Sequence, residues 1–286
     1  MLALATTAFA QLDAKALVEQ LRDDDQDWNA SRAMDALGEL PTPPIQELHA
    51  ALDSDDWQQR QIAAVLLWRF LHPYGYIRRG WHEWRLQPQG EITQRLIEVT
   101  VEGFRDDRLP YDRRPTRHTE APNAAEGFRH LRHHAKQAES QLAEGLNSDD
   151  YQQRFMCALT LGFGGVSSQA EGVARVLLPH LRDNDMPEDA KWCTAALLRV
   201  GPEVAPFLRA AQPEADAQQA ELIKLLLLDF EEPIFMGEGA DATPVYRCVA
   251  GSVLSPALMG RGDISMGWLH SLHDPNQPKP ASPSIP

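Results

Sequence analysis

Residues 52–60 read L-D-S-D-D-W-Q-Q-R, and residues 146–154 read L-N-S-D-D-Y-Q-Q-R, so that a nearly identical stretch recurs 94 positions later. Ser and Asp are the residue types that accept hydrogen bonds from the free N–H groups at the start of a helix. Their carboxylates also suit the positive end of the helix dipole. We therefore expect each copy to be an acidic turn that leads into a helix.

The sequence on both sides of each turn has helical spacing. Apolar residues recur at 62, 65 and 66 after the first copy and at 157, 158 and 161 after the second. Leu48 and Leu52 precede the first turn, and Leu142 and Leu146 precede the second. The repeating element is therefore helix, acidic turn, helix. Neither helix buries its apolar face alone, so neighbouring pairs must stack on one another.

Weaker copies of this element cover residues 14–40, 168–200 and 202–230. Leu21, Leu52, Leu146 and Leu181 occupy equivalent positions, and the adjacent pairs are 31 and 35 residues apart. Such periods are typical of helical solenoids. The final helix, 221–230, is apolar nearly all round and needs cover.

The second helices resemble those of HEAT repeats. R-Q-I-A-A (60–64) and R-F-M-C-A-L-T-L-G (154–162) approach the R-x-x-A-A-x-A-L-G pattern of that family. The sequence departs from the pattern where Ala30 replaces the arginine and where Gln59 and Gln153 replace the hydrophobic residue before it. The resemblance implies an all-α superhelix of antiparallel helix pairs that binds proteins, and it brings no catalytic residues.

From these patterns we predict an all-α solenoid with an irregular insertion and an extended C-terminal segment. The predicted parts are a signal-peptide remnant or frayed N-terminus (1–11), N-terminal HEAT-like repeats (12–71), an aromatic and basic insertion (72–136), C-terminal HEAT-like repeats (137–230), an irregular cap (231–274) and a disordered proline-rich tail (275–286). Within the insertion, the spacing of Ile92, Leu96, Val99 and Phe104 predicts a helix.

The insertion differs in charge from the rest of the chain. Residues 78–136 carry more Lys and Arg than Asp and Glu, whereas the whole chain has a net charge of −14. Its polar, proline-broken loop at 105–123 is longer than a compact fold normally contains. Either the insertion folds onto the acidic surface, which we favour, or it presents a site for an anionic partner. Arg113, Arg114 and Arg117 would carry that second role.

Aromatic residues gather just before this loop, in H-P-Y-G-Y-I-R-R-G-W-H-E-W-R (72–85). Trp81 and Trp84 beside arginines have the composition of protein-recognition hot spots. The simpler interpretation is that these rings are buried at an interface between repeats. We predict Trp81, Trp84 and the three arginines above as interaction candidates.

Composition and motifs exclude several classes of function. A strongly acidic chain disfavours nucleic-acid binding, because phosphate contacts need a basic surface, and no apolar run reaches the length that spans a bilayer. The common nucleophile, phosphate-binding and zinc-protease motifs are absent. One HEAT-repeat enzyme, deoxyhypusine hydroxylase, binds iron through repeated His-Glu dipeptides, of which only His82-Glu83 occurs here. We therefore predict that the chain is not an enzyme and has no cofactor.

Metal-binding and thiol chemistry are weakly indicated. His130, His133 and His134 would share one face if 124–136 were helical, but no further ligand is identifiable, and solvated surface histidines are the simpler interpretation. The three cysteines lie far apart, and Cys157 and Cys193 fall in apolar helical stretches, so we expect them to be small buried residues.

The N-terminus gives an ambiguous signal. M-L-A-L-A-T-T-A-F-A-Q ends a short apolar stretch in Ala8-Phe9-Ala10, a pattern that signal peptidase accepts, but it has no cationic region before it. We predict a cytoplasmic location in preference to export to the periplasm.

Two functions follow from these observations. The first is a non-catalytic protein–protein interaction scaffold that uses the concave surface of the solenoid. The second is a metal- or small-ligand-binding protein or enzyme with its site in the insertion, 72–136.

Overall fold

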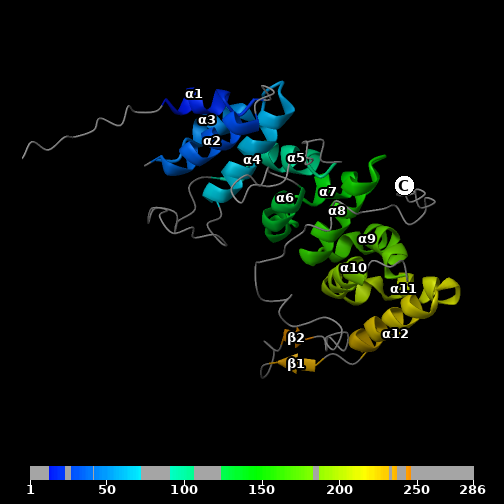
Figure 1. Cartoon of the computed structure of the whole chain (residues 1–286). Coiled ribbons are helices and arrows are strands. Elements are labelled where there is room, and N and C mark those ends of the chain that lie inside the picture. Colours follow the sequence, from blue (N-terminus) through cyan, green and yellow to red (C-terminus); the bar gives the residue numbers. More distant parts are fainter. Residues whose placement is uncertain are drawn as a thin grey trace, which may run out of the picture. The chain divides into compact units, whose positions relative to one another are not determined.

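The computed structural model of the chain describes residues 13–22, 27–40, 42–71, 91–105, 124–182, 187–231, 234–236 and 243–245. These residues are mainly helical, and successive helices form antiparallel pairs (Figure 1). The predicted fold class, an all-α solenoid, is confirmed. The chain divides into two compact units, Met1–Gly103 with Asp107–His130, and Phe104–Asp106 with Leu131–Pro286.

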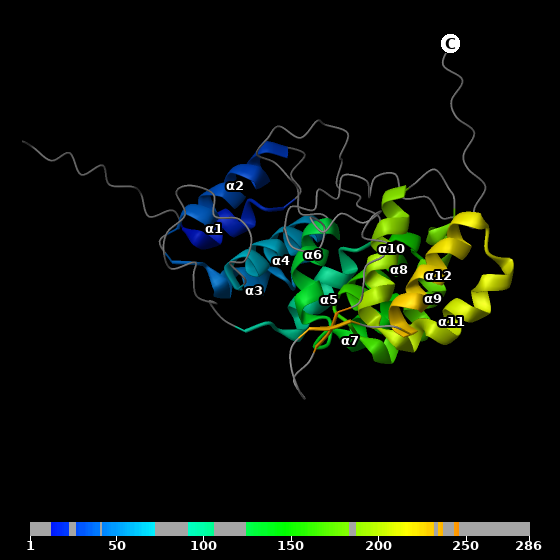
Figure 2. The ribbon, with the colours of Figure 1, turned by 90° about the horizontal axis from the view of Figure 1, so that it is seen from below.

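The first unit contains six helices within the described ranges, the last of which ends at the boundary of the unit. They are α1 (Ala14–Glu19), α2 (Asp27–Glu39), α3 (Ile45–Ala51), α4 (Trp57–Leu71), α5 (Gln94–Glu102) and α6 (Ala124–Leu131). Helix α1 packs on α2, α3 and α4, and α4 packs on both α3 and α5. The pairs α1–α2 and α3–α4 are seen side by side in Figure 2. The helix that the apolar spacing predicts within the insertion is α5.

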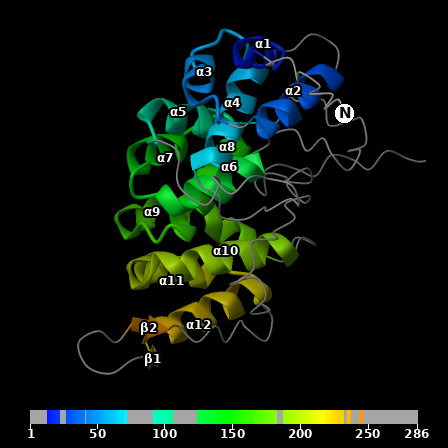
Figure 3. The same cartoon turned by 90° about the vertical axis from the view of Figure 1, so that its left-hand side faces the viewer.

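The second unit forms two layers of helices (Figure 3). One layer contains α7 (Glu139–Gly145), α9 (Ala170–Leu177) with the 3-10 turn η4 (Leu178–Leu181), and α11 (Ala205–Ala211); the other contains α8 (Tyr151–Phe163), α10 (Pro187–Val200) and α12 (Ala217–Glu231). Shorter 3-10 turns are η2 (Arg132–His134), η3 (Ser167–Gln169), η5 (Pro202–Val204) and η6 (Gln212–Glu214). Each first-layer helix packs on the second-layer helix that follows it.

The local sequence explains where several helices begin and end. Side-chain oxygens of Asp13 and Thr93 accept hydrogen bonds from main-chain N–H groups at the starts of α1 and α5. After α8 and α10, Gly165 and Gly201 have φ angles of +64° and +102°. Residues with a side chain rarely adopt these left-handed values, so glycine ends these segments at little cost.

The core differs in one respect from the sequence-based expectation of helices with one apolar face. In α4 nearly every residue from Gln59 onward is buried, and in α8 every residue from Phe155 to Gly162 is buried. The reason is that α4 contacts α1, α2, α3 and α5, while α8 contacts α7, α9, α10 and η2. The four equivalent leucines, Leu21, Leu52, Leu146 and Leu181, are buried as predicted.

Two short strands follow the last helix. Strand β1 (Ile234–Met236) pairs antiparallel with β2 (Thr243–Val245), with Phe235 opposite Pro244. The predicted N-terminal segment, the disordered tail and most of the insertion lie outside the described residues, and the predicted domain boundaries stay a prediction.

Candidate functional site

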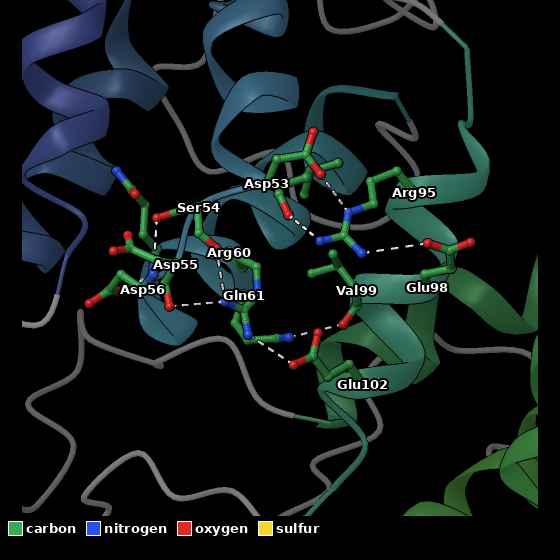
Figure 4. Close-up of polar contacts among 12 residues, drawn as sticks. Asp53, Ser54, Asp55, Asp56, Arg60, Gln61, Arg95, Glu98, Val99 and Glu102 are labelled. Atoms are coloured by element: carbon green, nitrogen blue, oxygen red, sulfur yellow. Dashed lines mark hydrogen bonds and ion pairs between the residues drawn. The ribbon is translucent and has the colours of Figure 1, made fainter.

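The first acidic turn is closed by its own side chains (Figure 4). The Ser54 hydroxyl accepts a hydrogen bond from the main-chain N–H of Asp56 at 3.1 Å. Asp56 Oδ1 accepts from the N–H of Gln59 at 2.7 Å, which caps the start of α4. Arg60 Nη1 then reaches back to the carbonyl oxygens of Ser54 and Asp55, at 2.9 and 3.2 Å. The predicted capping role of Ser and Asp is confirmed, and the arginine locks the turn.

The second acidic turn repeats these contacts. The N–H of Asp150 donates to the Ser148 hydroxyl at 3.1 Å, and Asp150 Oδ1 accepts from the N–H of Gln153 at 2.7 Å. Arg154 Nη1 donates to the carbonyls of Ser148 and Asp149 at 2.7 and 2.9 Å. The identical residues in the two copies therefore encode an identical turn.

The two glutamines of each copy tie the second helix to an earlier first helix. Gln58 Nε2 donates to the carbonyl of Leu21 at 3.3 Å, and Gln59 Nε2 donates to that of Val18 at 2.7 Å. These carbonyls lie at and just after the end of α1, where a helix leaves its last carbonyls without helical partners. We call this arrangement the glutamine clamp.

A clamp also forms at the second turn, against the residues that follow α5. Gln152 Nε2 donates to the carbonyls of Phe104 and Arg105 at 3.2 and 3.1 Å. Arg105 in turn donates to the side-chain oxygen of Gln153 at 3.1 Å. In both copies, the pair of glutamines thus forms hydrogen bonds with the residues at or after the end of an earlier helix.

The structure shows a third clamp that the sequence analysis missed. Asp216 Oδ1 accepts from the N–H of Gln219 at 2.8 Å, and Gln219 Nε2 donates to the carbonyl of Leu178 at 2.8 Å. Gln218 Nε2 donates to the carbonyls of Leu181 and Arg182 at 3.1 and 3.2 Å. This copy keeps only D-x-Q-Q (216–219) and lacks the serine and arginine of the turn.

The segments that the clamps hold, each at the end of a helix, share a short sequence. They read L-R-D at 21–23, F-R-D at 104–106 and L-R-D at 181–183. The arginine of each turns toward its clamp: Arg22 pairs with Asp55 at 2.9 Å, Arg105 with Asp149 at 3.3 Å, and Arg182 donates to the Gln219 side chain at 3.3 Å. The sequence contains three D-x-Q-Q motifs and an R-D dipeptide in each of the three segments that they hold. Together, these two motifs would have predicted all three clamps.

Ion pairs offset the negative charge around the first turn. Arg95 Nε lies 2.8 Å from Asp53 Oδ1, and its Nη2 donates to the carbonyl of Leu52 at 3.0 Å. Arg60 Nη2 lies 2.9 Å from Glu102 Oε1. Figure 4 shows these arginines between the turn and α5. The hydrogen bond from Arg22 holds the pKa of Asp55 below its usual value. The contacts of this site therefore join one helix to another.

A different surface lies where α8 meets α10 in the second unit. The Phe163 and Trp192 rings meet edge to face at 5.4 Å between centroids. The Arg199 guanidinium lies 5.6 Å from the centre of the Phe163 ring and also donates to the Phe163 carbonyl at 3.4 Å. Trp192 is buried, Phe163 is half-buried and Arg199 is exposed. We call these three residues the α8–α10 aromatic cluster.

A second aromatic group in the same unit consists of the half-buried Tyr151 and the buried Phe155 and His180. The Tyr151 hydroxyl and His180 Nε2 are 2.6 Å apart, and the Phe155 ring lies 4.4 Å from that of His180. His180, in η4, therefore fixes the start of α8 against the first helix of the next repeat.

The predicted site residues have different outcomes. Trp81, Trp84, Arg113, Arg114 and Arg117 lie outside the described residues, as does His82-Glu83, and stay predictions. Among the three histidines, His130 is not on the surface: it is buried and stacked on Trp68, with centroids 6.0 Å apart. Helix α6 ends at Leu131, so His133 and His134 fall in the turn η2.

Other expectations concern metals, membranes and thiols. Within the described ranges, no cluster of His, Cys, Asp and Glu is arranged to hold a metal ion. Nor does any described helix combine the length and apolar character needed to cross a bilayer. Cys157 and Cys193 are buried, as predicted. Burial raises the pKa of the Cys157 thiol, which keeps it protonated and unreactive.

Three comparisons with known proteins were made. No protein-family model matches the chain, and no curated protein matches its sequence. Among solved structures, the chain is similar to human deoxyhypusine hydroxylase in complex with glycerol, with 20% identity and a TM-score of 0.33. The match covers 76% of this chain and 73% of that one. That protein is named as an enzyme, which contradicts the prediction that this chain is not one, and the prediction is withdrawn.

Proposed function

We propose that the chain binds a protein or peptide on the side of its second-layer helices that faces away from the first layer. The observation that carries the proposal is the glutamine clamp, present in three copies. Gln59, Gln153 and Gln219 are buried, and their hydrogen bonds hold successive helix pairs in one register. A surface that is ordered in advance loses little conformational entropy when a partner binds, so more of the contact energy becomes affinity.

Within the second unit, the exposed Arg199 and the half-buried Phe163 of the α8–α10 aromatic cluster give this surface the composition of a binding hot spot, and the buried Trp192 packs against Phe163. Aromatic rings and arginine dominate such sites, because they combine large contact area with directional polar groups. On α10, Ala195 and Lys191 lie one and two turns before Arg199, respectively, and both are half-buried. These three residues form a stripe, which we call the α10 stripe. Its two cations favour a partner segment that carries carboxylates.

The test is a charge reversal on this stripe. The tagged full chain is purified from its native host after cross-linking, and partners are identified by mass spectrometry. The double variant Lys191→Glu, Arg199→Glu is expected to lose the partner that the parent chain retains. Binding of the purified partner, measured by calorimetry, should weaken about tenfold or more, which corresponds to roughly 1.4 kcal/mol.

The matched control is Arg209→Glu. Arg209 is exposed on α11, in the other layer, and pairs with Glu231 at 2.9 Å. This variant should retain the partner. Circular dichroism and thermal melting of both variants separate loss of binding from loss of folding. Equal affinity of the stripe variant and the control would contradict the proposal.

A further inference from the structure

The last helix, α12, leaves open a face that its counterparts bury. The glutamine clamp aligns the three second helices, because the N–H of Gln59, Gln153 or Gln219 donates in each case to the aspartate three residues earlier. Counting from these glutamines, three positions on one face correspond: Gln61, Val65 and Trp68 in α4; Phe155, Leu159 and Gly162 in α8; and Glu221, Leu225 and Leu228 in α12.

In α4 this face is covered by the next helix, α5. Gln61 Nε2 donates to the carbonyl of Val99 at 2.9 Å, and Trp68 Nε1 donates to the hydroxyl of Thr100 at 2.8 Å. Trp68 is completely buried. The cover therefore includes both apolar packing and specific hydrogen bonds.

In α8 the same face is covered by the next repeat. Phe155 lies against His180 of η4 with ring centroids 4.4 Å apart. Gly162 approaches Ala196 of α10 so closely that an added Cβ would lie 2.7 Å from the Cβ of Ala196. All three positions in α8 are buried.

In α12 the equivalent face is uncovered. Leu228 is 41% exposed, and it is the only large apolar side chain that is exposed among the residues the structure describes. Leu222 and Leu225, a turn or two earlier, are half-buried. An array of repeats must cover its terminal apolar face to remain soluble, and within the described ranges no helix follows α12.

We propose that residues 246–274 of this chain pack on the Leu225 and Leu228 face of α12, in the way that α5 packs on α4. The segment follows α12 in the same chain and can therefore reach this face. In the sequence, the β1–β2 hairpin lies between α12 and this segment. The hairpin begins next to the end of α12 (Figures 1 and 3). The segment contains apolar residues, among them Val253, Leu254, Leu258 and Met259.

The covalent connection favours this occupant over a second molecule. Residues 72–93 connect α4 to the helix that covers it, and the shorter stretch 232–245 connects α12 to the C-terminal segment. A tethered segment acts at an effective concentration in the millimolar range, far above that of another copy. The bound segment closes the end of the array, which prevents copies from stacking end to end through α12.

The first test uses hydrogen exchange of the full chain. In the parent protein the amides of 246–274 should exchange more slowly than those of an unprotected chain. In the double variant Leu225→Glu, Leu228→Glu they should exchange about tenfold faster than in the parent, because charge is placed in the contact. The control Ala217→Glu changes an exposed residue of the same helix and should leave this exchange unchanged. Unprotected exchange in the parent, or equal rates in parent and double variant, would overturn the proposal.

The second test holds even if the double variant fails to fold. A benzophenone is attached to the full chain carrying Leu228→Cys and Cys248→Ser, in which Cys157 and Cys193 are buried and unlabelled. Irradiation of a mixture of isotopically heavy and light chains should join residue 228 to 246–274 of the same molecule. Cross-links between heavy and light chains would identify a second copy as the occupant, and cross-links elsewhere in the same chain would place the segment away from α12. Either result would overturn the proposal.

Discussion

The two acidic turns, 52–60 and 146–154, are closed by the same hydrogen bonds and differ in what their helices contact further along the chain. Both use the same serine, aspartate and arginine atoms at nearly the same distances. Trp68 and Gly162 lie 94 residues apart and occupy the same position of the repeat. One has a large ring, whereas the other has no side chain. The comparison teaches that the turn is set locally, whereas the distance to the next helix is set by side-chain size.

The largest effect should come from removing the ring at the first of these positions. Trp68 is fully buried, stacks on His130 and donates to Thr100 at 2.8 Å. Trp68→Ala removes this packing and leaves the Thr100 hydroxyl without that donor, so we expect a loss of about 3–5 kcal/mol in the free energy of unfolding. Urea denaturation followed by circular dichroism measures it. A loss below about 1 kcal/mol would show that α4 and α5 do not pack as described.

At the equivalent position in the second copy, Gly162, adding a side chain instead of removing one should destabilise the fold. Gly162→Ala adds only one carbon, but that carbon would lie 2.7 Å from the Cβ of Ala196. The helices α8 and α10 must then move apart, at a cost of about 1–3 kcal/mol. The same denaturation experiment tests this, and a neutral or stabilising result would contradict the close approach of the two helices.

A smaller and equal effect is expected at the caps. Asp56 and Asp150 each accept a main-chain hydrogen bond of 2.7 Å at the start of their helices. Asp56→Ala and Asp150→Ala should therefore each lower the free energy of unfolding by about 1–2 kcal/mol. Asn at either position keeps the acceptor and should restore most of the loss. Unequal effects of the two alanine variants, beyond about 1 kcal/mol, would show that the turns are not equivalent.

The smallest effect concerns the pH dependence of the first turn. The hydrogen bond from Arg22 lowers the pKa of Asp55, so the pair stabilises the fold above the usual aspartate pKa. That contribution is lost as the pH falls through the lowered pKa of the folded state. Arg22→Gln should raise the pKa of Asp55 toward its usual value, as measured by carboxyl NMR titration.

Glu139 provides an internal control for that titration. Hydrogen bonds from Ser168 and Gln169 lower its pKa, and Arg22 is not among these donors. The pKa of Glu139 should therefore be the same in the parent and in Arg22→Gln. An unchanged pKa of Asp55 in the variant would mean that Arg22 does not pair with it in solution.

Much of the fold could be predicted because its signals are local. The acidic turns, the buried leucines and the α5 helix follow from spacing within a few residues. The third clamp was missed because its turn keeps only Asp216, Gln218 and Gln219 of the repeated sequence. The surface position expected of His130 was wrong because a long-range contact, with Trp68, buries the ring. No local pattern contains that information.

By itself, the sequence determined the helix–turn–helix element and its caps, since the hydrogen bonds of a turn join residues that are close along the chain. It also determined that these elements must stack, because each has more apolar surface than its partner helix covers. The tertiary structure alone decided which helix end each glutamine holds, how closely α10 approaches α8, and which face of α12 has no helix against it. These features depend on contacts between residues far apart in sequence, where side-chain volume and the available main-chain carbonyls select the neighbour.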